Sequence, residues 1–413
     1  MNNTTHSSYA ALYVRDFRFF VLSRLFVTLA IMIQAVVVGW QVYEITKDPL
    51  SLGLIGLAEA IPAITVSLYA GHLADVVERK KIILMCVFTL VLCSIALLYF
   101  TMDAGAFILA NGALPIYAVI FVSGIARGFL SPANFSFMPQ LIDRDLYQNA
   151  IVWNSTLWEG AAVGGPIIGG LVYGFYGITA AYSVDVALVV AGLICYVAIP
   201  NRALPPISEE QGIFEKIKAG IKFVFKNQII LSAISLDLFA VLFGGAVALL
   251  PIFADEILHV GKEGLGFLRS AQGIGAVLMA VYITRNPIKK RMGKILLWCV
   301  AGFGVCMIGF GLSKLFWLSM GLLILSGMFD CVSVIVRSTL IHTLTPENMK
   351  GRVSAVNSIF IGSSNEIGSF ESGVAAKLLG VVPSVIFGGL MTLGVVGITG
   401  WKAEKLRALD KVS

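Results

Sequence analysis

The chain has 413 residues, of which 58% are hydrophobic and 13% are charged. A soluble domain carries about 25% charged residues, so this composition excludes an ordinary soluble protein and indicates one that lies in a lipid bilayer. The net charge of +6 could suit nucleic acid, but the basic residues fall in short links between apolar runs. We therefore interpret the charge as a topology signal and expect no nucleic-acid partner.

Long apolar runs follow one another along the whole chain. A membrane-spanning helix needs roughly 20 mainly apolar residues. The first sixteen residues are polar and precede no cleavage site, so we expect no removable signal peptide. Runs of suitable length predict an all-α membrane protein with twelve transmembrane helices, at about 17–43, 50–72, 82–101, 115–140, 147–173, 177–199, 228–254, 264–284, 295–312, 316–341, 351–374 and 381–401.

Basic residues are unevenly distributed among the links between these runs. When alternate links are grouped, one set holds most of the lysines and arginines, and the other holds only Lys47, Lys262, Lys314 and Lys377. Both chain termini belong to the basic set. Because basic loops stay on the cytoplasmic side, we expect a multi-pass protein of a bacterial cytoplasmic (inner) membrane with both termini in the cytoplasm.

The second half of the chain repeats the first. Cys86 falls on Cys299 with a shift of 213, and Gly165 falls on Gly368 with a shift of 203. The repeat predicts two pseudo-symmetric six-helix bundles, at residues 1–200 and 228–413. The polar link 201–227 contains the basic amphipathic stretch IFEKIKAGIKFVF, which we expect to form a helix at the cytoplasmic face.

Signatures of enzymes and ATPases are missing from the sequence. It has no GxxxxGK[ST] phosphate loop, no CxxC and no HExxH, and its four histidines are scattered. All six cysteines lie in apolar runs, where small packing residues are expected. We expect no enzyme activity, no catalytic residues, no cofactor and no metal. The repeat instead favours a transporter, in which solutes pass between two helical bundles.

The link after the second run carries a recognisable motif. It resembles the G-x-L-A-D-x-x-G-R-K pattern of the major facilitator superfamily at Gly71, Leu73, Ala74, Asp75, Arg79 and Lys80. Val76 replaces a usual basic residue, and Glu78 replaces a usual glycine. The ERKK variant and SPANFSFMPQLI (131–142) are similar to the branch with enterobactin-type siderophore exporters and macrolide efflux proteins. The resemblance implies the major facilitator fold over the whole chain.

This motif has two interpretations. The resemblance implies that Gly71, Asp75, Arg79 and Lys80 form a conformational latch, in which charge-assisted contacts join the two halves in one state of the transport cycle. Such contacts near a helix end contribute about 0.3–2 kcal/mol each. The alternative is that these charges only set the topology.

A second motif lies in the fifth run. AAVGGPIIGG (161–170) resembles the G-x-x-x-G-P-x-x-G-G element of antiporters in this superfamily, with Gly165, Pro166, Gly169 and Gly170 in register and Ala161 replacing the first glycine. Small residues allow close helix approach and proline removes a backbone donor, so we expect a tight, kinked contact between the halves. Generic helix packing is the alternative.

Charged residues inside apolar runs are costly and therefore commonly functional. The repeat aligns Arg24 with Asp237 and Arg127 with Asp330. Since the resemblance places the first, fourth, seventh and tenth spans around the cavity, we expect a basic wall in the first half and an acidic wall in the second. These walls would bind an anionic or zwitterionic substrate, pair with each other when empty, or be neutralised by other neighbours. Trp158 could stack on an aromatic ligand.

Proton coupling requires a buried carboxylate that can bind and release a proton. Glu59, Glu159 and Glu366 lie near the middle of the second, fifth and eleventh runs. Glu371 is five residues from Glu366 and cannot share its helix face. We therefore expect Glu366 to face inward.

The sequence favours a secondary active transporter. We expect a monomeric, proton-coupled exporter (antiporter) of a small amphipathic molecule, such as a siderophore or drug, working by alternating access, with protons and lipid as its other partners. A facilitator or importer of a small nutrient, and a lysolipid-handling or receptor-like membrane protein, are the alternatives.

Overall fold

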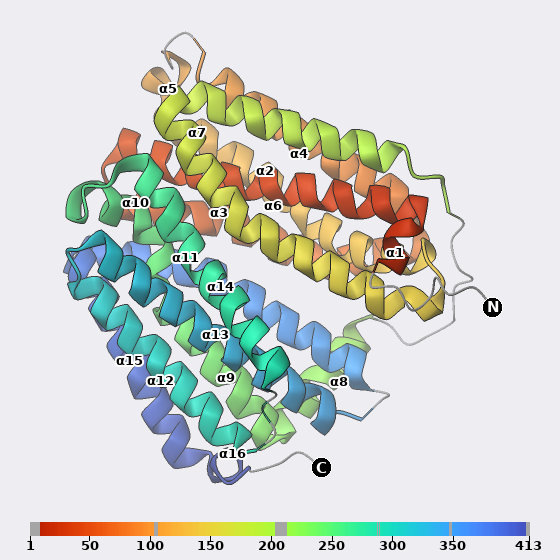
Figure 1. The fold of residues 1–413 in the computed structure, drawn as a ribbon, viewed down its shortest axis with the longest axis vertical. Coiled ribbons are helices and arrows are strands. Elements are labelled where there is room, and N and C mark those ends of the chain that lie inside the picture. The colour runs from red at the N-terminus through yellow and green to blue at the C-terminus, as the bar shows by residue number, and fades with distance from the viewer. Residues whose placement is uncertain are drawn as a thin grey trace. The chain divides into compact units, whose positions relative to one another are not determined.

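The chain is almost entirely helical. The computed structural model describes residues 9–102, 106–202, 213–286, 288, 290–346 and 349–409. These residues form helices joined by short turns, without a strand, which confirms the all-α prediction (Figure 1). Ten segments of the described chain are long and apolar enough to cross a membrane. The number of twelve crossings stays a prediction.

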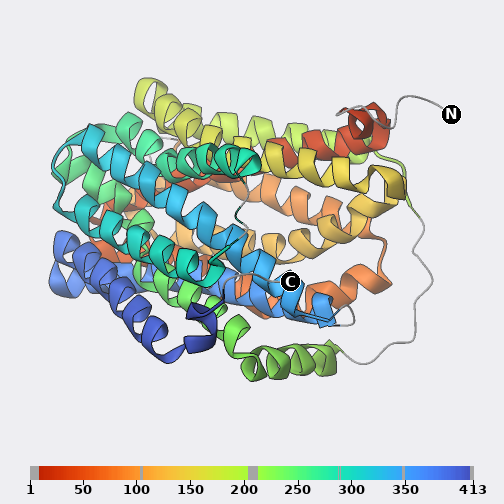
Figure 2. The same cartoon turned by 60° about the horizontal axis from the view of Figure 1, so that its bottom comes forward.

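The chain divides into two compact units, of which unit 1 comprises Met1–Lys47 and Ala58–Ser208. In this unit α2 packs against α7, and α4 packs against α6 and α7 (Figures 1 and 2). The rings of Phe20, Phe137 and Tyr196 join three of these helices, with centroids 6.1 and 6.2 Å from that of Phe20. The helices are α1 (Ala10–Tyr13), α2 (Arg15–Thr46), most of α3 (Pro49–Val76), α4 (Arg79–Tyr99), α5 (Ala106–Asn111), α6 (Leu114–Phe137) and α7 (Tyr147–Val197).

The long helix α7 contains the fifth and sixth apolar runs in succession. Its dihedral angles leave the helical range at Gly177, where φ is 85° and ψ is 174°. A glycine adopts this positive φ without the clash that a Cβ would cause. One residue therefore connects the two helices, where the sequence predicted a short link at 174–176.

Unit 2 comprises Asp48–Leu57 and Glu209–Ser413. In this unit α11 packs on α13, α12 on α13 and α15, and α9 on α14. The bounds are α8 (Ile213–Lys226), α9 (Gln228–Phe243), η5 (Ala246–Leu249), α10 (Leu250–Ile252), η6 (Phe253–Ile257), α11 (Gly261–Arg285), α12 (Met292–Leu312), α13 (Phe316–Leu344), α14 (Lys350–Leu379), α15 (Val381–Lys402) and α16 (Glu404–Arg407).

The seventh apolar run is not one regular helix. It leaves the α-helical form after Phe243 and continues as a 3₁₀ turn, a short α turn and a π turn. Gly244 closes α9, and a Cβ at this position would lie 2.5 Å from the ring of Phe303. The break falls at the Gly244–Gly245 pair, whose low helix propensity lowers the cost of leaving the helix.

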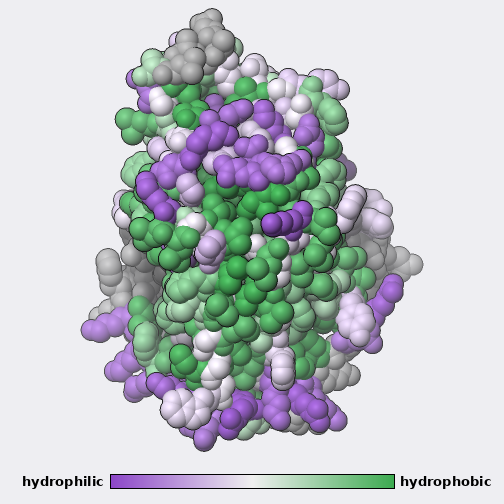
Figure 3. Space-filling view, turned by 90° about the vertical axis from the view of Figure 1, so that its left-hand side faces the viewer, coloured by the Kyte–Doolittle hydropathy of each residue, from purple (hydrophilic) through white to green (hydrophobic). Residues whose placement is uncertain are grey.

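The surface has the pattern of a membrane protein. On the face shown in Figure 3, hydrophobic side chains cover a broad middle band, and hydrophilic side chains gather above and below it. Large exposed apolar residues such as Phe175, Trp298 and Trp317 fit this interpretation, since they would be costly in water and stable in lipid.

Candidate functional site

Unit 1 contains a pocket built around Arg24. The guanidinium Nη1 of Arg24, in α2, donates a hydrogen bond of 2.8 Å to Oδ1 of Asn154 in α7. Trp158, one turn further along α7, lines the same narrow pocket. Two of the residues expected in a substrate cavity are therefore brought together. Asn154 is a third member that the sequence did not single out.

Arg127 and Glu59 form an ion pair within unit 1. The pair joins α6 to α3, and both side chains are half-buried. Gly124, one turn before Arg127, allows the close approach, because a Cβ there would lie 2.8 Å from the carbonyl oxygen of Glu59. Arg127 thus has an opposite charge on α3, which is the alternative in which a neighbour other than Asp330 neutralises it. A pairing between the two walls stays a prediction.

Unit 2 contains a pocket lined by carboxylates. Asp237 of α9 and Asp330 of α13 lie in its wall with Ser333. Asp237 is 7% exposed and forms an ion pair with Arg337 of α13, which is 2% exposed. The structure therefore brings both predicted acidic residues to one pocket, and neutralises one of them.

Arg337 was not predicted as a site residue. It was recognisable as a charge inside an apolar run, but its partner depends on how α9 and α13 are rotated about their axes. Among the described residues, neither Arg24 nor Asp330 has an ion-pair partner. Of the four charges expected to line the cavity, these two therefore remain for a ligand.

The candidate proton carriers lie on different helices. Glu159 follows Trp158 on α7 and is half-buried. Glu366 lies on α14 beside Gly56 of α3, where a Cβ would be 3.5 Å from its Oε2. The fifth and eleventh runs thus place each carboxylate in a partly buried position.

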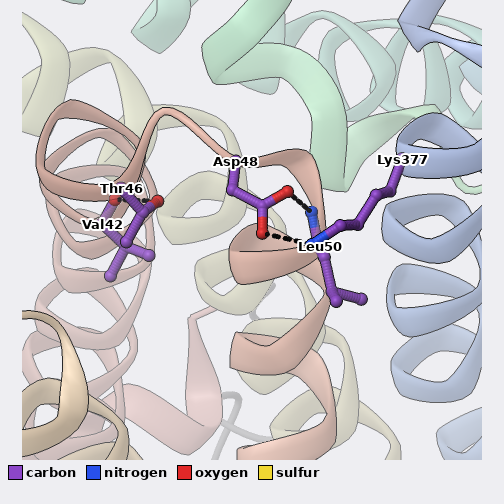
Figure 4. Close-up of polar contacts among 5 residues, drawn as sticks. All are labelled: Val42, Thr46, Asp48, Leu50 and Lys377. Carbon is purple, nitrogen blue, oxygen red and sulfur yellow. Dashed lines mark hydrogen bonds and ion pairs between the residues drawn. The ribbon is translucent and has the colours of Figure 1, made fainter.

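The first turns of α3 pack on α14 within unit 2. A Cβ at Gly53 would lie 3.0 Å from the carbonyl oxygen of Phe370 and 3.1 Å from Cα of Gly373. At the edge of this contact Asp48 accepts hydrogen bonds from the backbone N–H of Leu50 (3.3 Å) and from Nζ of Lys377 (3.1 Å) (Figure 4). Glycines therefore allow the two helices to lie close together, and the ion pair between Asp48 and Lys377 lies at the edge of their contact.

The predicted latch is only partly described. Gly71 and Asp75 lie at the end of α3, but their side chains are outside the described residues. Arg79 donates a 3.1 Å hydrogen bond to the carbonyl oxygen of Ser136. Lys80 is 8% exposed, and its ammonium group donates to the carbonyl oxygens of Val197 and Ile199, where α7 ends. These two side chains therefore stabilise helix ends within unit 1, and the latch stays a prediction.

The glycine element of the fifth run packs against α2. A Cβ at Gly165 would lie 2.5 Å from Cβ of Met32, and one at Gly169 would lie 3.1 Å from Cα of Ile33. Pro166 and Gly170 are also buried, and Pro166 lies in continuous helix. These described contacts belong to the packing of unit 1, and a contact of this element between the halves stays a prediction.

Three or more His, Cys, Asp or Glu side chains do not gather into a possible metal site anywhere in the described part of the chain. The described cysteines are unlinked, and most are buried. The residues that line the two pockets offer charge, hydrogen bonding and aromatic contact.

Comparison with known families decides the class of the protein. A family model described as "Transmembrane secretion effector" matches residues 6–413. The chain belongs to this family. Transmembrane secretion effectors are members of the major facilitator superfamily, as the sequence motifs had predicted.

Related proteins agree with this placement. The enterobactin exporter EntS of Escherichia coli O1:K1 / APEC is 25% identical over 386 residues, which cover 92% of this chain and 90% of the exporter. The transporter PepTSo of the POT family has a TM-score of 0.73 at 11% identity, covering 96% of this chain and 99% of its own. A bacterial homologue of the iron transporter ferroportin has a TM-score of 0.72 at 16% identity, covering 95% and 99%. These structures show the fold alone. This family member is therefore a membrane transporter of a small molecule, rather than an enzyme.

Proposed function

We propose that the protein is a proton-coupled exporter that moves a small amphipathic molecule, such as a siderophore or drug, across the bacterial cytoplasmic membrane by alternating access. The family match and the similarity to an enterobactin exporter support the direction. The observation that carries the chemistry is the pair of charges, Arg24 and Asp330, that line pockets without an ion-pair partner among the described residues.

The two pockets offer different chemical groups to a substrate. In unit 1 the guanidinium of Arg24 would bind an anionic or hydroxyl-rich group, while Trp158 offers an aromatic face. In unit 2 the Asp330 carboxylate would bind a cationic or hydrogen-bond-donating group. An amphipathic metabolite with an anionic or zwitterionic aromatic head suits this combination.

Glu366 is the proposed carrier of the coupling proton. It is half-buried on α14, next to the glycine-lined contact with α3. A carboxylate in this position can change its charge as neighbouring helices move, and the substrate would leave as the proton enters. We also propose that both termini face the cytoplasm and that the transporter works as a monomer.

Transport into inside-out vesicles tests the proposal. An acid-inside pH gradient should drive accumulation of a catecholate siderophore, and Glu366→Gln should abolish the gradient-driven part. Glu371→Gln, on the same helix, is the matched control and should retain it. Arg24→Gln should reduce uptake of the anionic siderophore more than that of a cationic dye. Equal flux with and without the gradient would favour a facilitator and contradict proton coupling.

A further inference from the structure

A second carboxylate lies buried in unit 1, away from both pockets. Asp185, in the part of α7 that follows Gly177, is 1% exposed. Neither of its carboxylate oxygens has a hydrogen-bond partner of regular geometry among the residues that the structure describes. Most buried polar groups are hydrogen-bonded, so this side chain calls for an explanation.

Among the residues that the structure describes, the neighbours of Asp185 supply no positive charge. Tyr182, one turn earlier, donates a 2.6 Å hydrogen bond to Gln41 of α2, and Gly192, two turns later, lies against Val27 of α2. The segment of α2 between these contacts, Val27–Gln41, has no ionisable side chain.

Helix α4 faces Asp185 from the other side with Cys93 and Ser94. The titratable groups around Asp185 are therefore the thiol of Cys93 and the phenol of Tyr182. Both are uncharged in their ordinary state at neutral pH, so neither can balance a negative charge.

An ionised carboxylate would be strongly unfavourable at this position. It would be removed from water without a counter-ion and beside a single hydroxyl, that of Ser94, and such groups take up a proton instead. We propose that Asp185 is a proton-binding site of unit 1, which holds its proton while α2, α4 and the second part of α7 are packed together and releases it only when this packing opens.

The fold supplies a means of opening. Gly177 alone connects the two parts of α7, and a residue at a helix junction can absorb a change in φ and ψ while both helices stay intact. Movement of residues 178–197 away from α2 or α4 would admit water to Asp185. If export is proton-coupled, as proposed above, Asp185 is then a proton carrier whose protonation depends on helix packing. Only this carrier role rests on the proposed function.

Infrared spectroscopy of the purified protein in lipid nanodiscs tests proton binding directly. A protonated carboxyl has a C=O stretching band that a carboxylate lacks. At neutral pH, Asp185→Asn should remove a protonated-carboxyl band present in the wild type. Asp237→Asn is the matched control, because Asp237 is also buried but is paired with Arg337 and is therefore ionised. It should remove no such band.

Ser94→Ala is a second variant that keeps the carboxyl and removes only the neighbouring hydroxyl. It should shift the Asp185 band in frequency, and it keeps the test usable if Asp185→Asn does not fold. A wild-type spectrum without a protonated-carboxyl band, or one whose band neither variant changes, would overturn the proposal.

The carrier role is tested separately in the vesicles described above. Asp185→Asn should abolish gradient-driven accumulation, and unchanged accumulation would overturn the carrier role. Absence of any gradient dependence in the wild type would contradict proton-coupled export and leave the infrared result standing.

Discussion

Asp185 in unit 1 and Asp237 in unit 2 are both buried aspartates on membrane helices, and their surroundings differ. Asp237 faces the guanidinium of Arg337, whereas Asp185 faces serine, cysteine and an uncharged stretch of α2. A buried carboxyl group is tolerated when its carboxylate pairs with a cation or when it binds a proton. The comparison shows that burial alone does not reveal which of the two a membrane aspartate uses.

The cations of unit 1 have two kinds of partner. Lys80 binds backbone carbonyl oxygens and Arg24 binds an amide. Arg127 binds a carboxylate, as Arg337 does in unit 2. Neutral partners stabilise a charge without cancelling it, whereas a carboxylate cancels it.

The largest expected effect comes from breaking the pair in unit 2. Arg337→Met should lower the free energy of unfolding by about 3–5 kcal/mol, because Asp237 is left buried without a counter-ion. Unfolding by SDS titration in mixed micelles measures this change. The double variant Arg337→Met, Asp237→Leu should recover most of the loss, since no charge then remains. A double variant as unstable as the single one would contradict the account.

A smaller effect is expected at the neutral partners of Lys80. Lys80→Met should cost about 1.5–3 kcal/mol, the range for hydrogen bonds to a charged group, because the carbonyl oxygens at the end of α7 lose their donor. Its neighbour Lys81 is the control. The side chain of Lys81 is 62% exposed and pairs with Glu78, so Lys81→Met should change stability by about 1 kcal/mol at most. Equal losses in the two variants would show that the Lys80 contacts add nothing.

The packing that shields Asp185 is tested by adding one methyl group. A Cβ at Gly192 would lie 2.7 Å from Cγ2 of Val27 and 3.2 Å from the carbonyl oxygen of Ser23. Gly192→Ala should therefore cost about 1–3 kcal/mol by overpacking and should speed hydrogen–deuterium exchange of the Asp185 proton. Gly164→Ala is the matched control, because a Cβ there meets no atom within 4 Å. It should leave both measurements close to wild type, or raise stability slightly through helix propensity.

The smallest effect is expected at the exposed pair of unit 2. The side chains of Lys377 and Asp48 are 51% and 32% exposed, and such pairs contribute about 0–1 kcal/mol. Lys377→Gln and Asp48→Asn should behave alike, because asparagine can still accept the hydrogen bond from Leu50 N–H. A loss well above 1 kcal/mol in either variant, measured by the same titration, would assign this pair a larger role.

Much of the fold could be predicted from the sequence for a physical reason. In a bilayer the backbone must satisfy its own hydrogen bonds, so a long apolar run has little choice but to form a helix. The local irregularities could not be predicted in this way. The turn at Gly177 and the break at Gly244 lie in glycine-rich apolar runs, and nothing nearby in the sequence distinguishes these glycines from Gly164, which stays helical.

The site was predicted less completely. The charges inside apolar runs were visible, and Asp237 and Asp330 do line one pocket. The pairing of Arg127 with Glu59 and of Arg337 with Asp237 depends on the rotation of each helix about its axis. Helical periodicity gives the relative positions of residues on one helix, but not which face meets which neighbour. Asp185 was visible as one charge among others, and only its lack of partners distinguishes it.

Helix α3 belongs partly to each unit, which limits where this chain can be divided into two fragments. Residues 48–57 count with unit 2, while the rest of the same helix counts with unit 1. A gene divided in the linker after Arg202 would yield a first fragment whose Gly53 and Gly56 face has no α14 to pack on. The second fragment would expose the matching strip of α14 at Ser369 and Gly373. Despite the internal repeat, the two gene halves should therefore yield folded protein only when they are expressed together.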